Sequence, residues 1–296
     1  MSPFTGLSAF PVTPLHETGV ALDAFQEIVS ALAATDVSTI GALGSTGLYP
    51  YLSVSARSEA YAASVAAAGK TPVLAGIGAL ILSDVLASAE AAERAGCAGL
   101  LLAPVSYLPL SDDEVVGLFE AVSDASGLPI LIYNNPGTTG VSISEELVGR
   151  LASIDRVKGM KNPSNPEGGA AAQIARLRGQ VPPDFSLGYS GDASISGAIE
   201  SGADAWYSVL AGTLPDVALR LWKNRNDTSR LTAETKRLEP LWALFNRFGS
   251  IRVIYEVARL EGKSNLGLPL PLLPLPKDAV AQIAQALETL EQLEVQ

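Results

Sequence analysis

Residues 98–134 read AGLLLAPVSYLPLSDDEVVGLFEAVSDASGLPILIYN. Two short apolar runs, 98–105 and 128–134, flank a segment with helical periodicity. In that segment Ser111 and Glu114 have the spacing of a capping box, and Gly127 is a suitable stop. Strands that are apolar throughout and are joined through a helix are typical of a parallel sheet covered on both faces. The stretch therefore predicts a strand–helix–strand unit.

The same alternation is found along most of the chain. The apolar runs lie at 6–14, 39–43, 72–78, 98–105, 128–134, 156–161, 185–191 and 203–210, and each precedes a helical pattern. Eight such units fit a (β/α)₈ barrel. An open doubly wound sheet is the alternative, but it usually has fewer strands and a phosphate-binding loop after the first one. We therefore predict an α/β protein with a (β/α)₈ TIM barrel over residues 1–227.

Residues 228–296 continue as helical patterns and predict a C-terminal helical region. Within it, residues 266–276 read LGLPLPLLPLP. The proline spacing is compatible with a ligand for modules that bind polyproline helices. No basic residues flank the segment, and it leads straight into a helix, so we interpret it as an extended apolar connector packed on the body of the protein.

Charge and hydropathy exclude several classes of partner. The chain has 296 residues, of which 48% are hydrophobic, and a formal net charge of −11. Because no basic cluster interrupts this balance, a nucleic-acid partner is not expected. No apolar run approaches the ~20 residues of a membrane span, and the N-terminus lacks the features of a signal peptide. We therefore predict a cytoplasmic protein without a membrane partner.

The chain contains one cysteine, Cys97, and one histidine, His16. These counts exclude a disulfide framework, a cysteine-based zinc site and a histidine cluster, so we predict no metal and no cofactor. Cys97 is expected to be a small buried residue and His16 a loop residue. The glycine-rich stretch 41–47 does not match a dinucleotide-binding loop, so nucleotide binding is not expected either.

In a barrel of this kind, chemistry is found at the C-terminal ends of the strands. Those ends supply one amine, phenols, hydroxyls and backbone N–H groups, but no metal-ligand set and no carboxylate pair. This composition suits carbonyl chemistry on an amine. In this hypothesis Lys161 attacks a 2-oxo acid, Tyr133 transfers protons, and Ser45 and Thr46 hold the carboxylate.

The segment VKGMK (157–161) contains two lysines whose side chains must point to opposite sides of a strand. Lys161 shares a face with Gly159 and Val157, whereas Lys158 shares the other face with Met160. Only one lysine can therefore face the barrel interior, and we expect Lys158 to lie outside.

The motifs at the strand ends together resemble the dihydrodipicolinate synthase / N-acetylneuraminate lyase family of class I aldolases. Family patterns similar to G-T/S-T-G-E, Y-N-x-P, G-x-K-x and S-G-D-D correspond to GSTGL (44–48), YNNP (133–136), GMKN (159–162) and SGDA (190–193). AGIGA (75–79) and AFPVTP (9–14) also resemble the family. The order and spacing of the motifs are kept over essentially the whole chain.

The resemblance implies a (β/α)₈ barrel that carries catalysis, followed by a helical C-terminal extension, in a homo-oligomer that is usually a tetramer. It implies that Lys161 forms a Schiff base and that Tyr133 is the acid and base. Ser45 and Thr46 correspond to the paired hydroxyls that bind the oxo acid's carboxylate and relay protons.

Other site residues follow from the resemblance and from the strand ends. Tyr107 corresponds to a catalytic tyrosine that reaches across a subunit interface in the synthases, with Ser106 as the competing alignment. Thr138, Gly191 and Val209 are expected to border the substrate.

Three positions depart from the family pattern. Thr138 stands where the synthases carry an arginine that clamps the aldehyde's carboxylate, Leu48 replaces a glutamate, and Ala193 replaces an aspartate. Losing a charge-assisted bidentate contact costs about 1.5–3 kcal/mol. We therefore expect the pocket for the second substrate to be less charged than in a synthase.

These observations predict a Schiff-base-forming lyase, either an aldolase or a dehydratase, that acts on pyruvate or a longer 2-oxo sugar acid. One alternative is 4-hydroxy-tetrahydrodipicolinate (dihydrodipicolinate) synthase itself, which condenses pyruvate with aspartate semialdehyde. An alternative of another class is a non-catalytic member of the family that binds a 2-oxo acid. The oligomer is expected to be a tetramer or a dimer.

Overall fold

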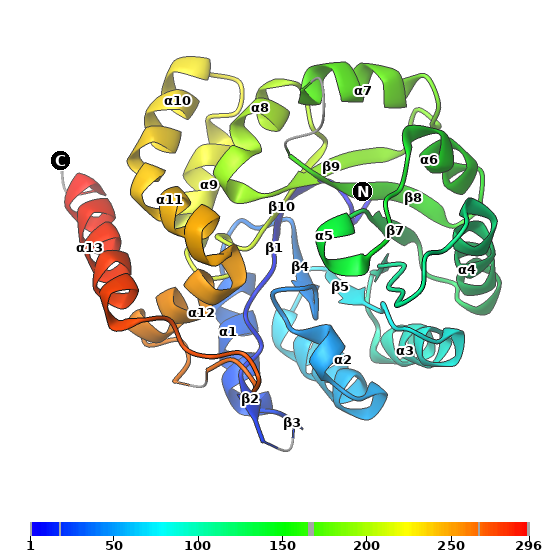
Figure 1. The fold of residues 1–296 in the computed structure, drawn as a ribbon, viewed down its shortest axis with the longest axis horizontal. Coiled ribbons are helices and arrows are strands. Elements are labelled where there is room, and N and C mark those ends of the chain that lie inside the picture. Colours follow the sequence, from blue (N-terminus) through cyan, green and yellow to red (C-terminus); the bar gives the residue numbers. More distant parts are fainter. Residues whose placement is uncertain (1, 18, 165–168, 266, 295–296) are drawn as a thin grey trace.

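The predicted barrel is confirmed. A computed structural model describes residues 2–17, 19–164, 169–265 and 267–294, and in it eight parallel strands close on themselves in the order β1-β10-β9-β8-β7-β6-β5-β4 (Figure 1). The strands are β1 (Gly6–Ala9), β4 (Thr39–Ala42), β5 (Val73–Gly76), β6 (Gly99–Leu102), β7 (Ile130–Tyr133), β8 (Val157–Pro163), β9 (Ser186–Ser190) and β10 (Ala205–Ser208). Each lies within or overlaps one of the predicted apolar runs.

Helices surround the barrel and cover the outer face of its strands (Figure 1). They are α1 (Leu22–Ala33), α2 (Val54–Ala68), α3 (Leu82–Ala95), α4 (Asp112–Ala125), α5 (Pro136–Thr139), α6 (Glu145–Ala152), α7 (Ala170–Arg178), α8 (Ile195–Glu200) and α9 (Pro215–Lys223), with short 3₁₀ turns η1 (Tyr49–Tyr51) and η2 (Asp192–Ser194). The helical pattern that follows the run 156–161 begins in the sequence at residue 166. Residues 166–168 lie outside the described residues, and α7 is described from Ala170 onward. One hydrophobic core runs between the helices and the strands.

Local signals set the ends of α4. The capping box is present, because the Ser111 hydroxyl accepts from the N–H of Glu114 and the Glu114 carboxylate accepts from the N–H of Ser111. The helix ends at Ala125, before the predicted stop at Gly127, because Ser126 already has an extended backbone with φ −130°.

Two aromatic rings fill the barrel beneath the C-terminal ends of its strands. Phe10 and Tyr207 meet edge to face with 6.0 Å between ring centroids. Glycines on the strands make room for them: a Cβ at Gly41 would lie 2.4 Å from the Phe10 ring, and one at Gly188 would lie 2.3 Å from Tyr207. These glycines therefore allow two large rings to form a solid floor.

A small two-stranded sheet was not predicted. It consists of β2 (Leu15–His16) and β3 (Gly19–Val20), which pair in antiparallel fashion. His16 thus lies in a short exposed strand, so its assignment to a loop is wrong. Runs of two residues are too short to show a strand periodicity in sequence. Cys97 is buried, as expected.

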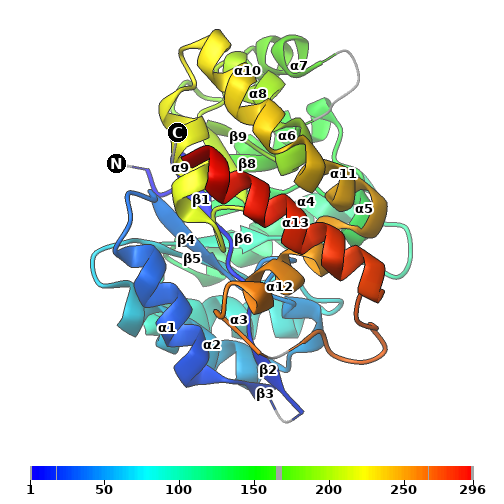
Figure 2. The same ribbon diagram turned by 90° about the vertical axis from the view of Figure 1, so that its left-hand side faces the viewer.

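The C-terminal region contains α10 (Thr228–Arg237), α11 (Glu239–Phe248), α12 (Ser250–Leu260) and α13 (Lys277–Glu294). Figure 2 shows α13 running across the outside of α11 and α12, both of which it contacts. Residues 267–276 form the connector between α12 and α13 and contain neither helix nor strand, whereas residue 266 is not described. The connector packs on the core through Leu268 and Leu275, but Leu270 and Leu273 are exposed, so the predicted packing is only partial.

No helix in the described part of the chain is both long and apolar enough to cross a membrane. Over the same residues, no group of three or more His, Cys, Asp or Glu side chains could hold a metal ion.

Candidate active site

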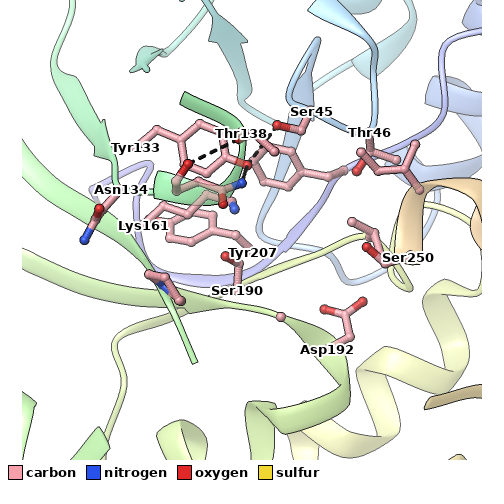
Figure 3. A pocket seen from close by; sticks show the side chains of 16 residues that line it. Ser45, Thr46, Tyr133, Asn134, Thr138, Lys161, Ser190, Asp192, Tyr207 and Ser250 are labelled. Carbon is pink, nitrogen blue, oxygen red and sulfur yellow. Dashed lines mark hydrogen bonds between the residues drawn. The ribbon is translucent and has the colours of Figure 1, made fainter. Parts of the chain in front are cut away.

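A cavity of about 250 Å³ opens at the C-terminal ends of the strands. Side chains from the strand ends, from α5 and from the start of α12 surround it (Figure 3). The lining residues are Phe10, Ser45, Thr46, Tyr133, Asn134, Asn135, Thr138, Lys161, Pro163, Ser190, Gly191, Asp192, Tyr207, Val209, Ser250 and Ile251.

Lys161 lies at the floor of this cavity. Strand parity places it as expected: Lys161 is 7% exposed, whereas Lys158 on the same strand is exposed to solvent. Its Nζ lies 4.1 Å from the centroid of the Tyr133 ring and 5.8 Å from that of Phe10. Because no carboxylate in the described part of the chain forms a salt bridge with it, the amine is available to a ligand.

Tyr133 lies beside Lys161 because β7 and β8 are neighbours and these two residues are paired in register. Its hydroxyl contacts the Ser45 hydroxyl at 3.0 Å and accepts a hydrogen bond from Asn135 Nδ2 at 2.9 Å. Burial opposes ionisation of this phenol, but the charge of Lys161 and these hydrogen bonds outweigh it, so the pKa of Tyr133 lies below its usual value. The group is therefore poised to give up and take back a proton near the amine.

The loop after β4 carries the two predicted hydroxyls. Thr46 is 2% exposed, and its carbonyl accepts a hydrogen bond at 3.1 Å from the hydroxyl of Tyr255 on α12. Leu43 and Leu48 flank the loop with φ angles of 56° and 57°, a left-handed conformation that costs a leucine about 1–2 kcal/mol. This cost is balanced by burial of both side chains in the core, so the loop has a defined shape.

Asp192 borders the cavity, but its carboxylate is engaged with the protein. Oδ1 accepts from Trp206 Nε1 at 2.9 Å, and Oδ2 accepts from the N–H of Leu210 at 2.7 Å and the hydroxyl of Ser208 at 3.2 Å. Burial raises the pKa of Asp192 despite these donors. The carboxylate thus ties η2 to the end of β10.

The structure brings most predicted site residues together. Lys161, Tyr133, Ser45, Thr46, Thr138, Gly191 and Val209 all border the one cavity. Tyr107 does not, because it is 91% exposed on the loop after β6, and Ser106 turns its hydroxyl to the carbonyl of Leu108. The predicted role of Tyr107 involves a neighbouring subunit, so it stays a prediction.

Several lining residues were not predicted. Phe10 directly follows β1 and Tyr207 lies within β10, where an aromatic residue has the same sequence signature as a core residue. Ser250 and Ile251 belong to α12, in the region expected to be only an extension. No periodicity signal indicates that a helix start will return to a strand end so far away in sequence. The amides of Asn134 and Asn135 could have been found from their positions at the end of the predicted run 128–134.

Comparisons with known proteins agree with this geometry. A model of the dihydrodipicolinate synthetase family matches residues 3–290. A 4-hydroxy-tetrahydrodipicolinate synthase from Azoarcus sp. is 31% identical over 278 residues, which are 92% of this chain and 93% of that protein. A second one, from Halalkalibacterium halodurans, is 28% identical over 93% of this chain and 94% of its own length. Among solved structures, dihydrodipicolinate synthase from Agrobacterium tumefaciens superposes with a TM-score of 0.95 at 43% identity and covers 97% of this chain and 98% of that one.

Proposed function

The chain belongs to the dihydrodipicolinate synthetase family and is a class I aldolase-type lyase, and we propose that Lys161 is the amine that carries its chemistry. The observation that supports this assignment most strongly is the buried Lys161 amine, 4.1 Å from the ring centre of Tyr133, in a cavity with no competing carboxylate partner among the described residues. The substrate is pyruvate or a longer 2-oxo acid.

The proposed reaction proceeds through a Schiff base between Lys161 and the substrate. The neutral amine of Lys161 adds to the 2-oxo carbon, and the carbinolamine takes up a proton from solvent and loses water to give a protonated Schiff base; this proton is released again when water frees the product. In the cleavage direction the bond between C3 and C4 breaks, and its electron pair moves into the Schiff base to form an enamine. The proton of the C4 hydroxyl passes to the base, and the C4 fragment leaves as an aldehyde. Protonation of the enamine at C3 and addition of water then release pyruvate and the free amine.

Tyr133 is the proposed base and acid in these steps. Its lowered pKa favours the phenolate that accepts the C4 hydroxyl proton, and the resulting phenol can return a proton to C3. Ser45 contacts the phenol and is the proposed relay to solvent.

Thr46 is proposed to hold the substrate's carboxylate. It is nearly fully buried and borders the cavity, and no hydrogen bond between its hydroxyl and another described residue is seen. A hydroxyl at the cavity wall can donate its hydrogen to an oxygen of a bound ligand. Thr138, Gly191 and Val209 border the rest of the substrate.

The names of the relatives favour 4-hydroxy-tetrahydrodipicolinate synthase as a second candidate. That reaction uses the same Schiff base with pyruvate but adds aspartate semialdehyde. Thr138, at the position of the synthases' arginine, is exposed and directs its hydroxyl to the carbonyl of Asn135. Condensation of pyruvate with aspartate semialdehyde at an ordinary rate would establish the synthase in place of a lyase with another partner.

Borohydride trapping tests the central assignment. We expect incubation with pyruvate and borohydride to add a reduced adduct to Lys161, located by mass spectrometry of peptides. Lys161→Ala should lose both the adduct and turnover. Lys158→Ala is the matched control, since it removes an exposed lysine from the same strand and should retain both. Absence of an adduct with pyruvate and with a panel of 2-oxo acids would reject the assignment.

The proposal also includes the setting of the enzyme. We propose a cytoplasmic protein in which residues 1–227 form the catalytic barrel domain and residues 228–296 a helical region, assembled as a tetramer or dimer. Exposed apolar side chains on the loops after β5 and β6 support the assembly, among them Ile81, Tyr107 and Leu108.

A further inference from the structure

We propose that the part of the substrate farthest from Lys161 is an apolar alkyl or aryl group, bound in a second cavity that continues from the first. This inference rests on the proposed Schiff-base chemistry at Lys161 and adds the class of the leaving aldehyde. The second cavity has a volume of about 590 Å³, which is large enough for a ring or a short chain.

The two cavities share a wall. Ser45, Thr138, Ser250 and Ile251 line both, so the second cavity opens directly at the mouth of the first. Figure 3 shows Ser45 and Thr138 on one side of the catalytic cavity and Ser250 across from them. A 2-oxo acid joined to Lys161 would therefore extend its tail past these residues.

The lining of the second cavity is apolar. Leu48, Tyr49, Val105, Phe248, Leu268 and Leu272 supply most of it. Arg252 is the only charged side chain among the described lining residues, and its Nη1 already donates to the carbonyl of Leu273 at 2.8 Å. The hydroxyls in the lining belong to Ser45, Tyr49, Tyr51, Thr138 and Ser250, and the remaining surface is mostly hydrocarbon, which gains by contact with an apolar tail.

Backbone geometry supports the place of Leu48 in the wall of the second cavity. The residue is held in a left-handed conformation with φ 57°, which is unfavourable for leucine, and it is 2% exposed. Backbone strain of this kind persists only where the surroundings fix it, and it is frequent at ligand sites. Here it directs an apolar side chain to the wall of the second cavity.

The opposite side of the catalytic cavity does not offer a better site for a hydroxylated tail. Its one carboxylate, on Asp192, already accepts from three donors of the protein. A sugar hydroxyl would have to compete with these bonds.

The test compares two substrates made from pyruvate, one by aldol addition to benzaldehyde and one by addition to glyceraldehyde. Both are 4-hydroxy-2-oxo acids and differ only in the tail. We expect kcat/KM, followed by mass spectrometry of the products, to be at least about tenfold higher for the phenyl compound.

Variants locate the effect. Phe248→Ala and Leu268→Ala, which remove apolar walls of the second cavity, should each lower the phenyl-to-glyceryl ratio of kcat/KM about tenfold while pyruvate trapping at Lys161 stays unchanged. Leu214→Ala is the matched control, because Leu214 is also partly buried but lines a separate cavity beside α9 and α13. It should leave the ratio unchanged.

Three results would overturn the inference. The first is a faster reaction of the glyceryl compound, and the second is a ratio that is insensitive to both variants. The third is a change of oligomeric mass in Phe248→Ala and Leu268→Ala with an unchanged ratio, which would assign the cavity to a second copy of the chain. Normal trapping of pyruvate in these cases would leave the proposed function intact, whereas loss of trapping in the wild type would refute both.

Discussion

Lys158 and Lys161 show how much a single position on a strand can determine. They lie on β8 only three residues apart, yet one is exposed and the other is 7% exposed at the floor of a cavity. The alternation of a strand explains the difference, and the register with β7 adds the phenol of Tyr133. Placement on the strand therefore separates two residues of the same type: Lys161 borders the cavity, whereas Lys158 faces solvent.

Tyr133 leads to a prediction on pH dependence. The pKa of Tyr133 lies below the usual value near 10, so the phenolate forms at lower pH than for a free tyrosine. If the reaction needs the phenolate, kcat/KM should increase as the pH is raised, and the midpoint of this increase should lie below pH 10. Tyr133→Phe should lower kcat about 10²–10⁴-fold and remove this rise, while the adduct on Lys161 can still be trapped. Tyr61→Phe alters a buried tyrosine that lines neither cavity and serves as the control. An unchanged pH profile in Tyr133→Phe would contradict the role.

Asp192 leads to a prediction on stability. The carboxylate of Asp192 has two acceptor oxygens, whereas the amide in Asp192→Asn has only one. Either the buried N–H of Leu210 or the indole N–H of Trp206 therefore loses its acceptor. We expect the free energy of unfolding to fall by about 1–3 kcal/mol, measured by urea denaturation. Asp184→Asn, at an exposed carboxylate, should change it by less than about 0.5 kcal/mol. Equal stability of the two variants would show that the three bonds contribute nothing.

At this scale the sequence predicted the residues that follow strands directly. It was possible to predict that Lys161, Tyr133, Ser45 and Thr46 lie close together, because strand ends meet at one face of a barrel. Tyr107 has the same kind of position, but its loop turns away from the cavity, and loop direction is not encoded in strand periodicity.

At the scale of elements, α12 links the C-terminal region to the loop after β4, which carries Ser45 and Thr46. The hydroxyl of Tyr255 accepts from the N–H of Thr13 and shares its single proton between the carbonyls of Thr13 and Thr46, each at 3.1 Å. These partners follow β1 and β4. One phenol on α12 therefore fixes the relative position of two strand-end loops.

We expect Tyr255→Phe to weaken substrate binding more than it slows the chemical step. Loss of the hydroxyl leaves the N–H of Thr13 without its acceptor and releases the loop that carries Thr46. KM for the 2-oxo acid should rise several-fold with little change in kcat, and the free energy of unfolding should fall by about 1–3 kcal/mol. Steady-state kinetics provide the measurement, with Tyr61→Phe as the control because Tyr61 is a buried phenol that lines neither cavity. A fall in kcat at constant KM would exclude a positioning role through Thr46.

The sequence predicted the barrel strands and the helical character of 228–296, because both have clear apolar patterns. It did not predict that α12 completes the site. The contact between Tyr255 and Thr13 joins residues 242 positions apart, and such a pairing leaves no trace in local periodicity. The two-stranded sheet β2–β3 was missed for the opposite reason, since it is too short to produce a pattern.

At the scale of the whole molecule, exposed apolar side chains indicate an assembly. Leu80, Ile81 and Leu82 follow β5, while Tyr107 and Leu108 follow the neighbouring β6, and all five are at least 45% exposed. Large exposed apolar side chains that gather on neighbouring loops are typical of interaction sites. We expect the protein to be a dimer or tetramer by light scattering.

The variant Ile81→Asp/Leu108→Asp should reduce the mass toward that of one chain, because it places charge in the apolar patch. Leu260→Asp adds a charge at an exposed leucine elsewhere and should leave the mass unchanged. If the wild type is a monomer at micromolar concentration, the patch does not form an interface between copies.

The position of α12 also has a consequence for biosynthesis. Ser250 and Ile251, which close one side of the cavity, are translated about 90 residues after Lys161. At roughly 5–20 residues per second, the ribosome needs about 5–20 s to cover that distance. During this interval β9 and β10 are also made, so all eight barrel strands precede the last wall of the cavity. The emerging polypeptide therefore acquires the complete lining of the cavity only late in translation.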